Sequence, residues 1–393
     1  MNRGKELAAA TEFQPPAPFG MEAQGHHLTF YPGGPDRLEA LLDLIASARE
    51  RLDVAFYIFS PDYSGHLVRD ALTDAARRGV LVTIILDGFG ATANESFFEP
   101  LISAGGRYRS FIAAFSFRYL IRNHQKMVIA DGVRAMLGGF NIEDSYFSDP
   151  QSNGWNDLAF IIEGEVVAQI ESWFGELDDW ADRPDAQFAD IRRKLRHWDA
   201  GQGPIQVLIG GPTRGLSSWA RRVSQDLARG TRLDMIMAYF SPPGRLLRRM
   251  GRIARTGEAR LVLAGKSDNP ATIGASRSLY GKLLKAGTRI WEFDACKLHT
   301  KLIVMDDVVY LGSANFDMRS LYINLEIVLR IEDKSLAAAM RRLVSRHLPA
   351  SIEVTPELHQ QRARPWNRVR WWTSWFLVSV VDYTVTRKLN LGL

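Results

Sequence analysis

The chain alternates short runs of apolar and β-branched residues with longer stretches in which apolar residues recur every three or four positions. Short apolar runs are typical of strands in a largely buried sheet, and they occur at 52–60, 80–86, 233–241 and 259–264. The wider spacing is typical of amphipathic helices, and it occurs at 39–51, 65–78, 166–179 and 336–348. Strands alternating with helices in this way predict an α/β fold.

The same pattern occurs twice along the chain. The segment NHQKMVIAD at 123–131 leads into LGGFN, and the segment LHTKLIVMD at 298–306 leads into LGSAN. Upstream of each motif, LDVAFYIFS at 52–60 corresponds to LDMIMAYFS at 233–241. Self-similarity over such a distance indicates a duplicated structural unit.

The duplication predicts two homologous domains. We expect a flexible N-terminal segment at 1–25, a first domain at 26–200, a second domain at 201–350 and a C-terminal tail at 351–393. Each domain is expected to be a mixed sheet flanked by helices. If the two domains pack about a pseudo-twofold axis, both copies of the motif face one shared cleft.

The positive charge of the chain is concentrated near its C-terminus. Lysine and arginine total 49 against 44 acidic residues, and the formal excess of +5 lies entirely within 362–393, which also contains four tryptophans. Basic residues beside tryptophan are typical of segments at an anionic membrane surface. The alternative is that the tail packs its aromatic residues on the second domain. No stretch reaches the ~20 apolar residues of a spanning helix, so we expect a peripheral association.

Each half contains His-x-Lys and then, after four further residues, Asp. The two sets are His124, Lys126 and Asp131 in the first half, and His299, Lys301 and Asp306 in the second. Residues i and i+2 of a strand share a face, so we expect each histidine to project beside its lysine. Asn141 and Asn315 follow at corresponding offsets and can donate hydrogen bonds into the cleft.

Two imidazoles, two ammonium groups and two carboxamides in one cleft suit the cleavage of a phosphodiester. One neutral imidazole can attack phosphorus and form a covalent intermediate. The second, when protonated, can donate to the leaving alkoxide and later activate the incoming hydroxyl. Lysines and asparagines can hold the non-bridging oxygens, where negative charge develops. The carboxylates of Asp157 and Glu326 can orient the imidazoles through their other nitrogens.

The paired motifs resemble those of the phospholipase D superfamily over roughly 30–348, and LGSANFDMRS at 311–320 is similar to a signature of bacterial cardiolipin synthases. FYIFSPD at 56–62 and RNHQK at 122–126 extend the resemblance. In length the chain resembles the short members that lack N-terminal transmembrane helices. The resemblance implies two phospholipase D-like domains and a phosphohistidine intermediate, with no metal or cofactor. The single cysteine, Cys296, likewise excludes a multi-cysteine zinc site.

The resemblance also implies roles for individual residues. The catalytic set would be His124, Lys126, Asp131, His299, Lys301 and Asp306, and the substrate-binding set would be Asn141, Asn315, Asp157 and Glu326. By analogy with the family, His124 is the nucleophile and His299 the acid and base, an order that the near-symmetric sequence does not determine. Asp157 falls where the acidic partner of the first domain is expected.

From this resemblance we expect a phosphatidyltransferase that moves a phosphatidyl group from phosphatidylglycerol to a hydroxyl of a second phospholipid. It would be peripheral on the cytoplasmic face of the bacterial inner membrane, with an anionic phospholipid surface as its partner. Two alternatives stay open: a phospholipase D that uses water as acceptor, and a phosphodiesterase acting on nucleic acid. The absence of net charge outside the tail argues against nucleic acid, whose binding grooves favour a basic track.

Overall fold

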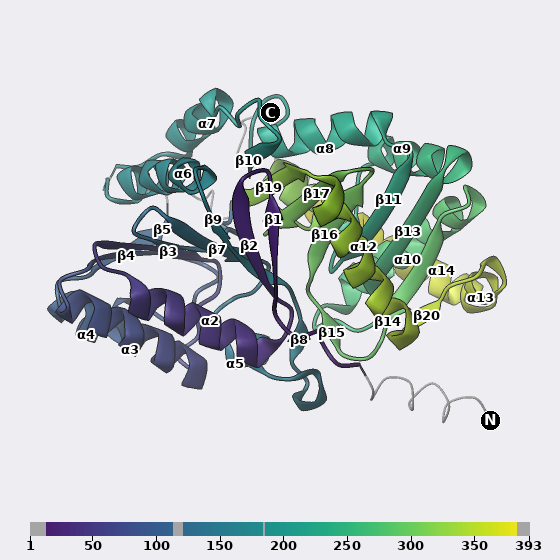
Figure 1. Cartoon of the computed structure of the whole chain (residues 1–393). Helices are drawn as coiled ribbons and strands as arrows, with labels where there is room; N and C mark the ends of the chain where they lie inside the picture. Colours follow the sequence, from purple (N-terminus) through teal and green to yellow (C-terminus); the bar gives the residue numbers. More distant parts are fainter. Residues whose placement is uncertain (1–12, 113–120, 184, 383–393) are drawn as a thin grey trace.

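The structure is a computed structural model that describes residues 13–112, 121–183 and 185–382 (Figure 1). Its first large sheet has the strand order β1 (Phe19–Ala23), β2 (His26–Tyr31), β9 (Ala159–Glu163), β7 (Arg134–Gly138), β6 (Met127–Ala130), β3 (Arg51–Phe56), β4 (Leu81–Asp87), β5 (Arg107–Phe111). The second has the order β10 (Ile205–Gly210), β19 (Glu326–Glu332), β17 (Val308–Gly312), β16 (Lys301–Met305), β11 (Arg232–Met237), β13 (Glu258–Ala264), β14 (Arg289–Phe293), β20 (Ser351–Glu353).

The two sheets have matching topologies. In the first, β3, β4 and β5 run parallel, while β6, β7, β9 and β2 follow antiparallel on the other side of β3. In the second, β11, β13 and β14 are parallel, and β16, β17, β19 and β10 are antiparallel in the same order. The predicted pair of homologous α/β domains with mixed sheets is therefore confirmed.

Helices cover both sheets. Those of the first domain are α2 (Gly34–Ser47), α3 (Tyr63–Arg77), α4 (Glu99–Ser103), α5 (Asp144–Phe147), α6 (Val166–Ala181) and α7 (Phe188–His197). Those of the second domain are α8 (Ser218–Arg229), α9 (Gly244–Thr256), α10 (Pro270–Lys285), α11 (Met318–Tyr322) and α12 (Lys334–His347). The four helices predicted from apolar spacing correspond to α2, α3, α6 and α12.

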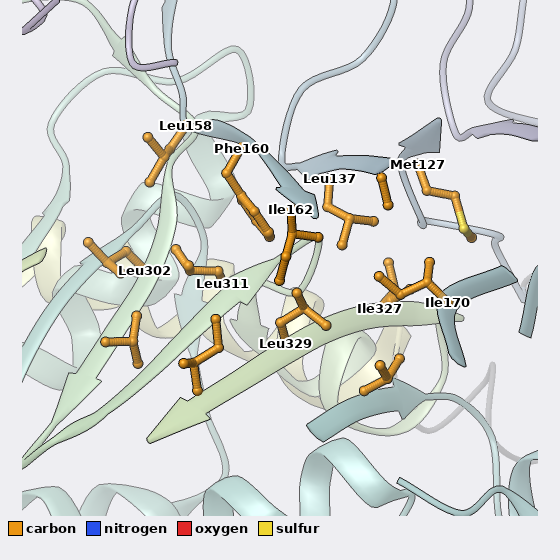
Figure 2. Packing of buried hydrophobic residues seen from close by; sticks show 14 of the residues in the cluster. Met127, Leu137, Leu158, Phe160, Ile162, Ile170, Leu302, Leu311, Ile327 and Leu329 are labelled. Atoms are coloured by element: carbon orange, nitrogen blue, oxygen red, sulfur yellow. The ribbon is translucent and has the colours of Figure 1, made fainter. Parts of the chain in front are cut away.

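Alternation along the strands gives each sheet two apolar faces. On β9, Phe160 and Ile162 belong to a cluster that also contains Leu311 of β17 and Leu329 of β19, whereas Ile161 packs with the outer helices α2 and α3. Figure 2 shows labelled side chains of both domains within this shared cluster. Because side chains alternate across a strand, one face of the first sheet packs on α2 and α3, while the other face packs on α6 and on the partner domain. In the second sheet α12 lies in the same shared cluster.

The first domain begins earlier than predicted. Strand β1 pairs antiparallel with β2 through a tight turn at Gln24 and Gly25, whose φ angles are 52° and 75°. Such positive φ angles are typical of two-residue hairpin turns, and the glycine makes the turn favourable. The predicted flexible segment at 1–25 is thus wrong for its described part, and 1–12 lie outside the described residues. At the other boundary, β20 extends the second sheet beyond 350.

After β20, the described part of the tail is helical. It consists of α13 (Pro356–Arg362), α14 (Pro365–Phe376) and a π-helical turn η4 (Leu377–Val381). Helix α14 packs against α10 of the second domain. The remainder of the predicted tail, 383–393, lies outside the described residues.

The two motif aspartates do not lie with the motif histidines. Asp131 follows β6, at the opposite end of that strand from His124, and its carboxylate accepts hydrogen bonds from the backbone N–H groups of Arg49, Glu50 and Arg51. Asp306 follows β16 and accepts in the same way from Thr231 and Arg232. Both aspartates adopt positive φ angles, 55° and 48°. The prediction that they are catalytic is therefore corrected: they cap the start of a neighbouring strand.

Candidate active site

Both motifs open into one cavity of about 570 Å³. The first domain contributes His124 and Asn141 to its lining, and the second contributes His299 and Asn315. The other predicted site residues, namely Lys126, Lys301, Asp157 and Glu326, are buried and contact or interact electrostatically with these histidines. The described structure thus brings together eight of the ten predicted site residues, all except Asp131 and Asp306.

His124 is held by a carboxylate from the other domain. Its Nδ1 lies 3.1 Å from Oε2 and 3.0 Å from Oε1 of Glu326, which is fully buried at the start of β19. The backbone makes the same crossing, because His124 N–H donates to the carbonyl of Leu325 at 2.9 Å. A neighbouring hydroxyl, Ser313, also donates to Glu326. His124 is therefore fixed with Nδ1 toward the carboxylate and Nε2 toward the cavity.

His299 is held by the reciprocal arrangement. Its Nδ1 lies 2.7 Å from Oδ2 of Asp157, and its backbone N–H donates to the carbonyl of Asn156 at 2.7 Å. The short strands β8 (Trp155–Asn156) and β15 (Lys297–Leu298) pair across the domains at this point. The sequence places Asp157 in the first domain, yet it orients the histidine of the second. Each domain thus supplies the carboxylate for its partner's imidazole.

The two lysines are buried behind the histidines. Nζ of Lys126 donates to the carbonyl oxygen of His124 at 2.6 Å, and Nζ of Lys301 lies 2.8 Å from Nδ1 of His299. Burial lowers the pKa of Lys126 to about 7 and that of Lys301 to about 8, although Glu326 and Asp157 oppose the shift. Both ammonium groups therefore lose their protons at a pH well below the usual range for lysine.

Burial also determines the charge state of the histidines. Desolvation lowers the pKa of His124 to about 4 and that of His299 to about 3, although the paired carboxylates oppose this. Both imidazoles are therefore neutral near pH 7 when the site is empty. For His124, a proton on Nδ1 donated to Glu326 leaves the lone pair of Nε2 free to attack an electrophile.

The histidines differ in their surroundings. Nε2 of His299 lies 3.4 Å from the hydroxyl of Tyr146, whereas Nε2 of His124 has no hydrogen-bond partner within the described ranges. The side chain of His124 is also the more exposed, at 12% against 4% for His299. His124 is thus the histidine that a substrate phosphorus reaches more easily.

Several residues that build the site did not stand out in the sequence. The ring of Tyr57 lies 4.9 Å from that of His124, and the rings of Tyr146 and Trp155 lie 5.1 and 5.3 Å from that of His299. Tyr57 and Tyr239 both line the cavity and lie near the ends of the repeated strands, one position out of register because Tyr57 corresponds to Ala238. An aromatic residue near the end of each repeat is a signal that sequence reading can find. Tyr146 and Trp155 have no such signal.

Arg37 is a further positioning residue. Its guanidinium is fully buried and donates to the carbonyl oxygens of Asp157, at 2.6 Å, and Tyr146. It therefore holds the loop that carries the carboxylate partner of His299. Burial raises the pKa of Asp157, but Lys301 and His299 outweigh it and hold that pKa below its usual value.

Two homologous α/β domains that exchange carboxylates around a pair of His-x-Lys motifs define the class as a phospholipase D-type enzyme. A family model described as cardiolipin synthase, phospholipase D-like domain, matches residues 41–178 and 225–348. Since these segments make up more than half of the chain, the protein belongs to that family.

The relatives agree with this family. The chain is 29% identical over 351 residues to the major cardiolipin synthase of Bacillus subtilis, covering 86% of this chain and 72% of the relative. It is 27% identical to cardiolipin synthase 1 of Staphylococcus aureus, covering 87% and 71%. Among solved structures, phosphatidylserine synthase of Haemophilus influenzae matches with a TM-score of 0.73 at 14% identity, covering 98% and 99%, and this likeness concerns the fold alone.

These findings confirm the predicted kinship with the phospholipase D superfamily and the predicted enzyme class, a phosphatidyltransferase of the cardiolipin synthase type. Among the described helices, none has both the length and the apolar character to cross a bilayer.

The buried lysines predict an alkaline limit to activity. Each ammonium is present below its lowered pKa and lost above it, so the charge that binds a phosphodiester disappears as pH rises through about 7 to 8. We expect kcat/KM to fall as pH rises through this range, because the two ammonium charges beside the histidines are lost. A pH profile of kcat/KM is the measurement, and constant values up to about pH 9 would contradict the lysine assignment.

Replacement of a capping aspartate is expected to lower the stability of the protein without lowering the activity of the folded fraction. Asp131→Ala removes the acceptor of three backbone N–H groups and is expected to lower the free energy of unfolding by about 2 kcal/mol. Asp131→Asn keeps an acceptor oxygen and tolerates the positive φ, so it should cost less. Urea unfolding and the specific activity of the folded fraction test this. A stable but inactive Asp131→Ala protein would return the aspartate to the catalytic set.

Proposed function

We propose that the protein is a cardiolipin synthase that acts at an anionic membrane surface. It transfers a phosphatidyl group from phosphatidylglycerol to a hydroxyl of a second phosphatidylglycerol and releases glycerol. The observation that carries the proposal is the pair of exchanged contacts, His124 with Glu326 and His299 with Asp157, around one cavity. Membership of the cardiolipin synthase family and the charge of the tail support it.

In the first step Nε2 of His124 attacks phosphorus. The bond between phosphorus and the oxygen of the headgroup glycerol breaks, and a phosphatidyl-histidine forms. His299 donates a proton to the departing glycerol alkoxide. Although His299 is neutral in the empty site, the negative charge of a bound phosphodiester favours its protonated form. Lys126 and Lys301 stabilise the negative charge on the non-bridging oxygens.

In the second step the hydroxyl of another phosphatidylglycerol enters the cavity. His299, now neutral, removes the proton of that hydroxyl while its oxygen attacks phosphorus and the bond to His124 breaks. His124 is then free again, and His299 carries the proton that it had when the first step began. The amide oxygen of Asn315 is buried in the cavity lining with no hydrogen-bond partner in the part of the chain that the structure describes. It can accept a hydrogen bond from a glycerol hydroxyl.

Incubation with phosphatidylglycerol vesicles in a metal chelator, followed by mass spectrometry of the lipids, tests the reaction. We expect cardiolipin and free glycerol. Phosphatidic acid as the sole product would instead identify a hydrolase with the same residues. An unchanged lipid in the presence of folded protein would refute the proposed substrate, and cleavage of single-stranded DNA would then favour the nucleic-acid alternative.

The order of the two histidines is tested with phosphatidyl-p-nitrophenol, because nitrophenolate leaves without a proton donor. His299→Ala should release nearly one equivalent of nitrophenolate in a burst and then stop, since no base activates the acceptor. His124→Ala should release none, because it lacks the nucleophile.

Both variants must first match the circular dichroism spectrum of the unchanged protein. The opposite result, a burst with His124→Ala and none with His299→Ala, would exchange the two roles.

A further inference from the structure

The end of the described tail forms part of the wall of the active-site cavity. The cavity that contains His124 and His299 is also lined by Leu377 and Val378 of η4 and by Asp382. From the sequence, the tail was expected to lie outside the two domains. Part of the tail nevertheless lies in the wall of the cavity that contains the two histidines.

Specific contacts fix the position of these helices. Trp371 of α14 is buried and stacks on His359 at 5.7 Å. Gly274 of α10 leaves room for the tail, because a Cβ there would come within 2.6 Å of the hydroxyl oxygen of Ser374. At the cavity, Arg319 donates to both oxygens of Asp382, at 2.8 and 3.0 Å. The inner face of α14 and η4 is thus attached to the second domain.

The opposite face is apolar and exposed. Trp366, Val369, Trp372 and Phe376 follow one another at spacings of three, three and four residues, which places them on one side of a helix. Leu377 and Val381 continue the exposed surface toward the cavity. We call these six residues the outer stripe. An exposed apolar surface of this kind usually marks a contact with a membrane or a protein.

The charges around the outer stripe favour an anionic lipid surface. Exposed Arg364, Arg368 and Arg370 flank it, and no acidic residue occurs between Ala363 and Val381. Beside Trp372, a groove of about 780 Å³ between the tail and α10 is also lined by Lys282 and Lys285. Tryptophan prefers the headgroup level of a bilayer, and each nearby basic residue adds attraction to anionic lipid.

We infer that η4 forms the acyl-chain side of the active site and that α14 places it at the membrane. The outer stripe lies in the interface of an anionic bilayer, and Leu377 and Val378 guide the acyl chains of a bound phospholipid from the cavity into that interface. Only the headgroup then has to reach His124, and the chains never cross water. This inference rests on the proposed function, because it takes a phospholipid as the substrate.

The membrane contact is tested with Trp366→Ala/Trp372→Ala. The matched control is Leu81→Ala/Val133→Ala in the first domain, where the exposed fractions are 65% and 58% against 79% and 58% for the tryptophans. We expect the tail variant to bind phosphatidylglycerol vesicles at least about tenfold more weakly, with a similar loss of activity on vesicles. Its activity on monomeric dihexanoyl phosphatidylglycerol should stay within about twofold, and the control should match the unchanged protein in every assay.

Vesicle binding that equals that of the control would overturn the inference. A dimer in sedimentation analysis that the tail variant abolishes would also overturn it, because a second copy would then cover the outer stripe. Binding is measured without turnover, so a protein that binds vesicles but transforms no phospholipid refutes the proposed function and leaves the membrane contact standing.

The chain path is tested with monomeric phosphatidylglycerols of increasing acyl length. For the unchanged protein kcat/KM should rise by up to about fourfold for each methylene that becomes buried. Val378→Asp places a charge beside that path and should flatten the dependence on chain length, while Val378→Leu should preserve it. Equal kcat/KM for all lengths in the unchanged protein would refute the acyl-chain site, even if cardiolipin is formed.

Discussion

The site depends on one constraint, that each domain supplies the carboxylate for the histidine of the other. Glu326 reaches His124 and Asp157 reaches His299, and a backbone hydrogen bond from each histidine crosses the interface beside the carboxylate. Neither imidazole can be oriented by its own domain alone. The apolar cluster between the two sheets therefore has a catalytic consequence, because it holds the carboxylates and imidazoles at hydrogen-bonding distance.

The same burial that builds the interface determines the chemistry of the site. Two lysines and two carboxylates are withdrawn from water together, so each charge is partly compensated by its neighbours. The imidazoles, each next to a lysine, stay neutral, as nucleophilic attack requires. An anionic substrate changes this balance in the direction that protonates His299. In the proposed mechanism, the incoming phosphodiester thus helps to protonate the histidine that acts as the acid in the first step.

Much of the fold could be predicted from sequence, because the repeated pattern marks the central strands, four long helices and eight site residues. The hydrogen bond between Asp157 and His299 could not be predicted, because a sequence motif does not show which domain a side chain faces. Strand β1 was missed because its hairpin depends on positive φ angles at Gln24 and Gly25. The contact of Asp382 with Arg319 joins the tail to α11, and no local sequence pattern predicts a contact between residues so far apart in the chain.

The two halves have also diverged where it matters for mechanism. Ser313 donates to Glu326 beside His124, whereas the corresponding position in the first half is Gly139. A Cβ at Gly139 would come within 2.6 Å of Asp157 and 3.0 Å of Lys301, so glycine is what lets that carboxylate and lysine approach His299 closely. Duplication therefore supplied two equivalent histidines, and small differences behind them made one more open to phosphorus and the other more enclosed. The proposed two-step transfer uses this asymmetry, because in it one histidine bonds to phosphorus while the other only moves protons.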